Sequence, residues 1–172
     1  MLHLFVYGSL KQGHCNYHQV ERWVVDSRPA HVEGRLYLRP DGYPVLWIPS
    51  SERALPGSGD ARADLRAQVQ PLPHPEPVTG AEWVPGELLR LEGKPEVLTR
   101  LDHFEGYRFG AGASEYRRVL LPARLSSGLV RAWTYVCSET QEQAGMFGWK
   151  LIDQWPPPGS SPPPPYTGGC SP

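Results

Sequence analysis

The alternation of apolar and polar residues along the chain predicts several β-strands. Leu4 to Tyr7 is a short apolar run of strand-forming residues, which indicates a buried strand. From His31 to Leu38 every second residue is apolar or glycine, so this segment is predicted to be a strand with one face in the core. Val45 to Ile48 is a further short apolar run. Trp83 to Leu91 is typical of a longer strand in which Gly86 marks a bulge or bend.

The second half of the chain predicts a helix and two more strands. Pro95 to Glu105 has proline in its first turn and glycine directly after its end, both typical of a helix. Tyr116 to Leu121 and Val130 to Val136 are predicted strands, joined by a turn at 126–128. This order of elements predicts an α+β fold, in which a mixed, largely antiparallel sheet forms a small β-barrel with flanking helices.

Two segments rich in proline, glycine and serine interrupt these patterns. We expect about 49–80 to be an insertion that runs over the surface, with a helical turn or two at 61–69. Residues 156–172 contain too few apolar side chains for a core, so we expect a disordered tail after a single domain at 1–155. The proline runs of the tail leave a second interpretation open, a weak ligand for an aromatic groove of another protein.

Charge and cysteine content exclude several classes of function. Lysine and arginine total 17 against 18 acidic residues, and the net charge of −1 gives no basis for binding nucleic acid or an anionic membrane. No apolar run approaches the about 20 residues of a membrane helix, and the N-terminus lacks the features of a signal peptide. Cys15, Cys137 and Cys170 form neither a metal-binding spacing nor a disulfide framework, which favours a cytoplasmic location.

Glu105 is the carboxylate that the helical pattern singles out. At about 100° per residue, Val97, Leu98, Leu101 and Phe104 fall on one stripe, and Glu105 lies at its edge, while Asp102 lies further round. Both the helix dipole and partial burial would raise the pKa of a carboxyl group at this end of the helix. A raised pKa suits a proton-transfer role. At this point a frayed helix end, with the carboxylate in water, remains the alternative.

The turn after the first strand is the second candidate. Gly8 is expected to adopt backbone dihedrals that other residues avoid. A strand that ends in such a Gly-Ser turn presents consecutive main-chain N–H groups, which suit an anion or a developing oxyanion. The alternative is an ordinary strand followed by a tight turn.

Three motifs, taken in order, resemble those of one protein family. They are Tyr7-Gly8-Ser9-Leu10, Leu101-Asp102-x-x-Glu105-Gly106 and Tyr116-Arg117-Arg118. Together they resemble the γ-glutamylcyclotransferase-like proteins, especially the AIG2-like and γ-glutamylamine cyclotransferase branch, over 2–136 outside the insertion. The resemblance implies a small mixed β-barrel that releases 5-oxoproline from small-molecule γ-glutamyl compounds, without a cofactor or metal.

The resemblance also implies roles for individual residues. Glu105 would be the catalytic acid and base, and the turn formed by Tyr7, Gly8, Ser9 and Leu10 would bind the substrate.

For Tyr116 and Arg118, which share one strand face, two interpretations stay open. They either contact the substrate, with Arg118 pairing with a carboxylate, or serve strand packing and an ion pair. A non-catalytic binding module on the same fold is the alternative to an enzyme.

The sequence supports three other kinds of site less strongly. Ser9 as an acyl nucleophile lacks the Gly-x-Ser-x-Gly pattern and a paired histidine. Cys15 with His14 or His18 is a further Cys–His candidate. His14 and His18 are spaced to bind a metal together, but no third ligand is evident.

Overall fold

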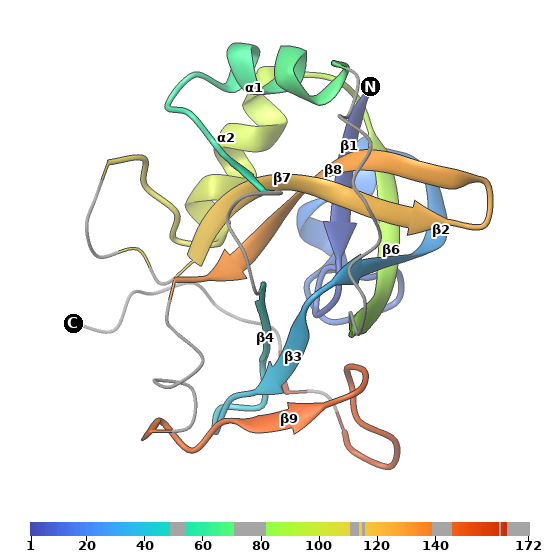
Figure 1. The fold of residues 1–172 in the computed structure, drawn as a ribbon, viewed down its shortest axis with the longest axis vertical. Helices are drawn as coiled ribbons and strands as arrows, with labels where there is room; N and C mark the ends of the chain where they lie inside the picture. Colours follow the sequence, from blue (N-terminus) through green and yellow to red (C-terminus); the bar gives the residue numbers. More distant parts are fainter. Residues whose placement is uncertain are drawn as a thin grey trace.

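Five strands form the closed barrel of the computed structural model, which describes residues 1–48, 54–70, 82–110, 114, 116–138, 146–161 and 163–164. The strands are β1 (Leu2–Val6), β2 (Val24–Glu33), β6 (Trp83–Leu91), β7 (Tyr116–Leu125) and β8 (Gly128–Cys137). Their order is β2-β6-β1-β8-β7, and β2 also pairs with β7, which closes the barrel (Figure 1). The β1–β8 pair is parallel and the others are antiparallel, so the predicted fold class is confirmed.

A second, three-stranded sheet lies at one end of the molecule in Figure 1, away from the helices. It consists of β4 (Pro44–Trp47), β3 (Arg35–Leu38) and β9 (Lys150–Ile152). Two short 3-10 helices, Tyr17–Gln19 and Glu21–Trp23, connect β1 to β2.

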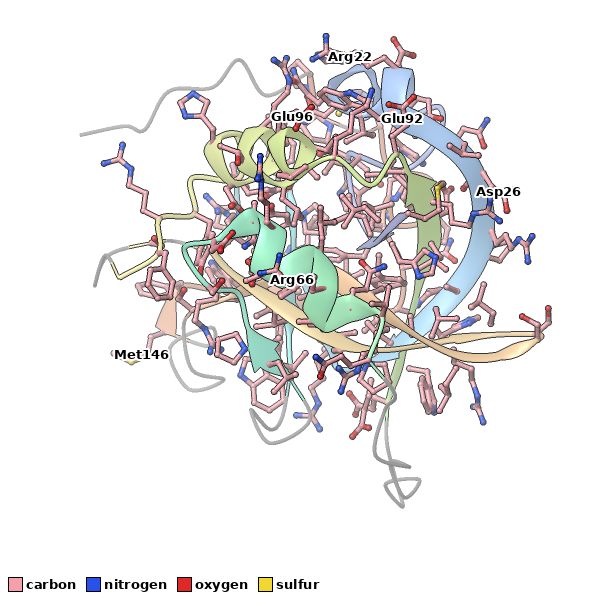
Figure 2. The ribbon with its side chains drawn as sticks, turned by 90° about the horizontal axis from the view of Figure 1, so that it is seen from above. Arg22, Asp26, Arg66, Glu92, Glu96 and Met146 are labelled. Carbon is pink, nitrogen blue, oxygen red and sulfur yellow. The ribbon has the colours of Figure 1, made fainter. Side chains whose placement is uncertain are left out.

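Helices α1 (Ala61–Gln68) and α2 (Pro95–Phe104) lie side by side at the other end (Figures 1 and 2). The Asp60 side chain caps α1 by accepting hydrogen bonds from the N–H groups of Arg62 and Ala63. Helix α2 begins with Pro95 and ends before Gly106, whose φ of 66° is the left-handed conformation that glycine adopts without strain. The helix predicted at 95–105 is therefore confirmed.

The sheet buries both of its faces, as the alternation along β7 shows. Val119 and Leu121 point into the barrel, where they join Phe5 and Val136. Leu120 points the other way, into a cluster under the helices that includes Leu2, Leu4, Val97, Leu98, Leu101 and Trp133. The apolar stripe predicted for α2 is thus the face that attaches it to the barrel.

The segment predicted as one strand at 31–38 is two strands in two sheets. The chain bends at Gly34, between β2 and β3. A Cβ atom at this position would lie 2.6 Å from the carbonyl oxygen of Trp47, so only glycine allows β4 to approach this closely. Gly86 is not the predicted bulge, since it pairs in register with Ala30. Glycine is needed there for space, because a Cβ atom would lie 2.4 Å from the Val6 carbonyl oxygen.

The expectation of a surface insertion at 49–80 is wrong for the described residues 54–70. Leu55–Pro56 forms β5 on the edge of β7, and Ala54 is buried in the barrel core. Helix α1 follows and buries Asp64 and Gln68 against the body. Residues 49–53 and 71–80 lie outside the described part of the chain.

The C-terminal segment contacts the body as far as it is described. Trp155 is buried in the barrel cluster, and its Nε1 donates to the Gly42 carbonyl oxygen at 2.9 Å. Further along, the Tyr43 hydroxyl donates to the Pro164 carbonyl oxygen. In the described part of the predicted disordered tail, 156–157 and 163 are partly buried and 158–161 and 164 are exposed, while 162 and 165–172 lie outside the described residues.

Among the described residues, neither α1 nor α2 has the length and apolar character that crossing a membrane as a helix would require.

Candidate active site

Glu105 lies at the C-terminal end of α2, where its residue is partly buried. Within the described part of the chain its carboxyl group has no hydrogen-bond or ion-pair partner. Burial of this carboxyl group, reinforced by the negative charge of Asp102, raises the pKa of Glu105 to about 8. The group can therefore both take and return a proton near neutral pH.

Tyrosine side chains gather around Glu105. Burial raises the pKa of Tyr7, Tyr116 and Tyr135, and the charge of a nearby Glu105 carboxylate raises the pKa of each of them further. The Tyr7 hydroxyl donates to the Tyr135 carbonyl oxygen at 2.8 Å, and the Tyr116 hydroxyl accepts from Arg39 Nη1 at 3.5 Å. The structure thus brings Tyr7 and Tyr116 to Glu105, as uncharged hydroxyl groups.

The Tyr7–Leu10 turn follows β1 directly and packs beside α2. Leu10 is buried in the same cluster as Leu98 and Leu101. The carbonyl oxygens of Gly8 and Ser9 accept hydrogen bonds from the N–H groups of Lys11 and Asn16, each at 3.0 Å. By contrast, the N–H groups of Gly8, Ser9 and Leu10 donate to no other residue that the structure describes. Three successive N–H groups without a partner among the described residues are candidates for binding an anion.

Gly8 does not have a positive φ, so the expected unusual dihedral is wrong. Glycine is required there for space, because a Cβ atom would lie 2.7 Å from Pro44 Cγ of β4. The close packing of Pro44 fixes the position of the turn relative to the second sheet.

Arg118 lies at the centre of a buried ion-pair network. Its side chain is 1% exposed, and its guanidinium group pairs with Asp64 of α1 and with Asp102 of α2, the latter at 2.6 Å. Ser58 holds Asp64 through its N–H group at 3.0 Å and its hydroxyl at 2.8 Å. The Tyr135 hydroxyl donates to Asp102 at 2.8 Å, which connects the network to the residues around Glu105.

Arg118 therefore does not offer its charge to a substrate carboxylate, because two carboxylates of the chain already neutralise it. Of the two interpretations that the sequence left open, this geometry favours the ion pair. Sequence reasoning missed Asp64, for which no local signal exists, and placed Asp102 away from the site. The spacing of three residues between Asp102 and Glu105 puts the two side chains on neighbouring positions of one helix face, which was the available signal.

The alternative nucleophiles lack the partners that they need. Among the described residues, Ser9 Oγ accepts a hydrogen bond from Asn16 Nδ2 at 2.9 Å and has no histidine partner. His18 Nδ1 lies 3.1 Å from the Cys15 main-chain oxygen, not from its thiol, and burial raises the pKa of Cys15. The described residues contain no group of three metal-ligating side chains.

A cavity of about 300 Å³ lies beside this site, after the C-terminal end of α2. Tyr107, Arg108 and Phe109 line one side, and Gly57 and Arg117 line another. Because the two exposed arginines Arg108 and Arg117 border it, we refer to it as the basic cavity. Glu105 itself is not among its lining residues.

Comparison with known proteins finds one matching family and a relative of known name. The profile of the family described as "gamma-glutamyl cyclotransferase, AIG2-like" matches residues 4–61 and 58–150. Gamma-L-glutamyl-butirosin B gamma-glutamyl cyclotransferase of Niallia circulans is 27% identical over 138 residues, which cover 79% of this chain and 67% of that protein.

One solved structure shares the fold. An AIG2-like protein from Mus musculus superimposes with a TM-score of 0.59 and 19% identity, covering 98% of this chain and 99% of the mouse chain. YkqA from Bacillus subtilis gives a TM-score of 0.49 and 16% identity, covering 84% of this chain. The chain spans only 38% of the length of YkqA.

The buried ion-pair network generates a prediction on stability. Asp64→Ala removes one of the two carboxylates that neutralise Arg118, and breaking a buried pair in this way costs about 3 kcal/mol of unfolding free energy. Asp26→Ala is the control, since Asp26 pairs with Arg28 at 2.8 Å on the surface, where an ion pair contributes at most about 1 kcal/mol. Urea unfolding of both variants measures the difference, and equal losses would contradict a structural role for Asp64.

Proposed function

The chain belongs to the AIG2-like γ-glutamyl cyclotransferase family, and on this basis we propose that it releases 5-oxoproline and an amine from small γ-glutamyl compounds. The observation that carries the proposal is the carboxyl group of Glu105, with a pKa raised to about 8, beside a turn with three N–H groups. Neither the carboxyl group nor these N–H groups have a partner among the described residues. The named activity of the Niallia circulans relative, which acts on a γ-glutamyl compound, supports the same type of reaction.

The reaction is an intramolecular aminolysis. The α-amine of the substrate attacks its own γ-carbonyl carbon, so a C–N bond forms and closes a five-membered ring. The α-amine has a reference pKa of about 8, close to that of Glu105, so a proton passes between them at little cost. The ionised Glu105 carboxylate accepts the proton that the attacking nitrogen loses.

The second half of the reaction returns this proton. The bond between the γ-carbon and the leaving nitrogen breaks, and Glu105 donates its proton to that nitrogen, so that a neutral amine departs. The N–H groups of Gly8, Ser9 and Leu10 hold either the substrate carboxylate or the oxyanion that develops on the carbonyl oxygen. Tyr7 and Tyr116 supply polar hydroxyl groups beside Glu105 and orient the substrate for ring closure.

Replacing the carboxyl group tests the proton transfer. Glu105→Gln keeps the shape and removes the titratable group, so 5-oxoproline release should fall by at least about 100-fold, the low end of general acid–base catalysis. His103→Ala is the control, because His103 is exposed on the same helix and should leave turnover nearly unchanged. The measurement is 5-oxoproline release from a panel of γ-glutamyl amines, amino acids and peptides. Full activity of Glu105→Gln would contradict the proton-transfer role of Glu105, whereas no 5-oxoproline release by the wild type would favour the non-catalytic binding module.

The raised pKa of Glu105 also predicts how stability depends on pH. Between its usual pKa of 4.5 and about 8, the folded protein keeps the Glu105 proton while the unfolded chain has lost it. Raising the pH through this range therefore costs the folded state stability. Glu105→Gln should melt at the same temperature as the wild type near pH 4.5 and at an increasingly higher temperature towards pH 8. A constant difference across this range would show that Glu105 titrates normally.

Gly8→Ala tests the turn as the substrate-binding element. The added Cβ must displace Pro44 or the turn, so kcat/KM should fall at least about tenfold in a folded protein. Gly13→Ala in the same loop is the control. Its Cβ would meet no atom within 4 Å, but its φ of 78° makes alanine strained, so that variant should lose stability and keep its kcat/KM. Equal kcat/KM for Gly8→Ala and the wild type would contradict the assignment.

A further inference from the structure

The basic cavity is held in shape by contacts between two segments that are distant in the sequence. The Tyr107 hydroxyl donates to the Gly57 carbonyl oxygen at 3.2 Å. Phe109 packs against Gly59, where an added Cβ would lie 3.0 Å from its ring. The Arg108 N–H group donates to Ser114 Oγ at 3.1 Å, which closes the loop after α2.

The described residues that line the cavity carry positive charge and no negative charge. Arg108 and Arg117 are exposed and form no ion pair within the described part of the chain. Arg118 also borders the cavity, but Asp64 and Asp102 neutralise its charge. No acidic side chain is among the described residues that line the cavity. Two unpaired arginines beside aromatic rings in a hollow of about 300 Å³ suit a small organic anion.

Two chain segments connect the cavity to the candidate active site. Tyr107 is two residues beyond Glu105, and two residues of chain span at most about 7 Å. On the other wall, Arg118 borders the cavity and pairs with Asp102, three residues before Glu105, at 2.6 Å. The cavity therefore adjoins the end of the helix that positions Glu105.

We propose that the basic cavity binds an anionic group on the leaving amine. On this basis the preferred substrates are γ-glutamyl peptides whose leaving part ends in a free carboxylate, with Arg108 and Arg117 as the residues that recognise it. This inference rests on the proposed function, because it assigns a subsite for the same reaction.

A matched pair of substrates tests the inference. One is a dipeptide that carries a γ-glutamyl group on its N-terminus and has a free C-terminal carboxylate. The other is the same compound with that carboxylate converted to an amide. The kcat/KM of the wild type should be about fivefold higher for the acid than for the amide. This factor corresponds to the upper end of the free energy that one exposed ion pair contributes. The preference should shrink as salt is raised, because salt screens exposed charges.

Substitutions then assign the preference to the cavity. Arg108→Gln and Arg117→Gln should each lower the acid-to-amide ratio, and the double variant should bring it close to one. Arg66→Gln is the control, since Arg66 is exposed on α1 and does not line the cavity (Figure 2). It removes the same charge and should keep the wild-type ratio. Thermal melts establish that each variant is folded.

The outcomes separate this inference from the proposed function. Equal kcat/KM for acid and amide in the wild type would overturn the inference while 5-oxoproline release still supported the function. A ratio that survives in the double variant would also overturn it, because the preference would then arise elsewhere. If no γ-glutamyl compound of the panel released 5-oxoproline, the proposed function itself would fail, and the subsite with it.

Discussion

The buried charge of Arg118 is the constraint on which the arrangement of the helices depends. An isolated guanidinium group out of water costs several kcal/mol, so it requires carboxylates at hydrogen-bonding distance. Asp64 comes from α1 and Asp102 from α2, which ties both helices to β7. The Trp133 and Tyr107 rings lie 5.0 and 5.6 Å from the same group and exclude water around it. Because Asp102 also accepts from Tyr135, the network positions the helix that ends in Glu105.

Two carboxyl groups on α2 have opposite environments as a result. Burial raises the pKa of Asp102, but Arg118 and the Tyr135 hydroxyl both stabilise its charged form. Glu105 has no such partner in the described part of the chain, so burial acts on it unopposed and the Asp102 charge adds to the effect. In the proposed function, acids whose environments differ in this way have different roles: Asp102 would stay a fixed anion and Glu105 would exchange protons. The two pKa values differ in their causes because Asp102 contacts Arg118 and Glu105 does not.

Local sequence patterns predicted the strands and the helix that local interactions determine. The apolar runs of β6, β7 and β8 and the apolar stripe on α2 are local signals, so these elements and the fold class were predictable. The break at Gly34, the space around Gly8 and the packing of α1 depend on residues far away in the sequence, such as Trp47, Pro44 and Arg118. Composition alone predicted a surface insertion at 49–80, because α1 is rich in polar residues. One of them, Asp64, is buried in an ion pair with Arg118, which lies 54 residues further along the chain. The position of Glu105 was predictable from helical phase, whereas its missing partner was not.

Neighbouring arginines on β7 illustrate how burial decides between structure and recognition. Arg117 is exposed and Arg118 is buried, as the alternation of a strand requires. The buried one is neutralised by the chain itself and holds α1 and α2, whereas the exposed one retains its charge beside the basic cavity. The same segment, 54–70, supplies both Asp64 and the Gly57 wall of that cavity. Changes in this segment therefore alter the support of the Glu105 helix and the shape of the neighbouring cavity together, so the two properties are physically coupled.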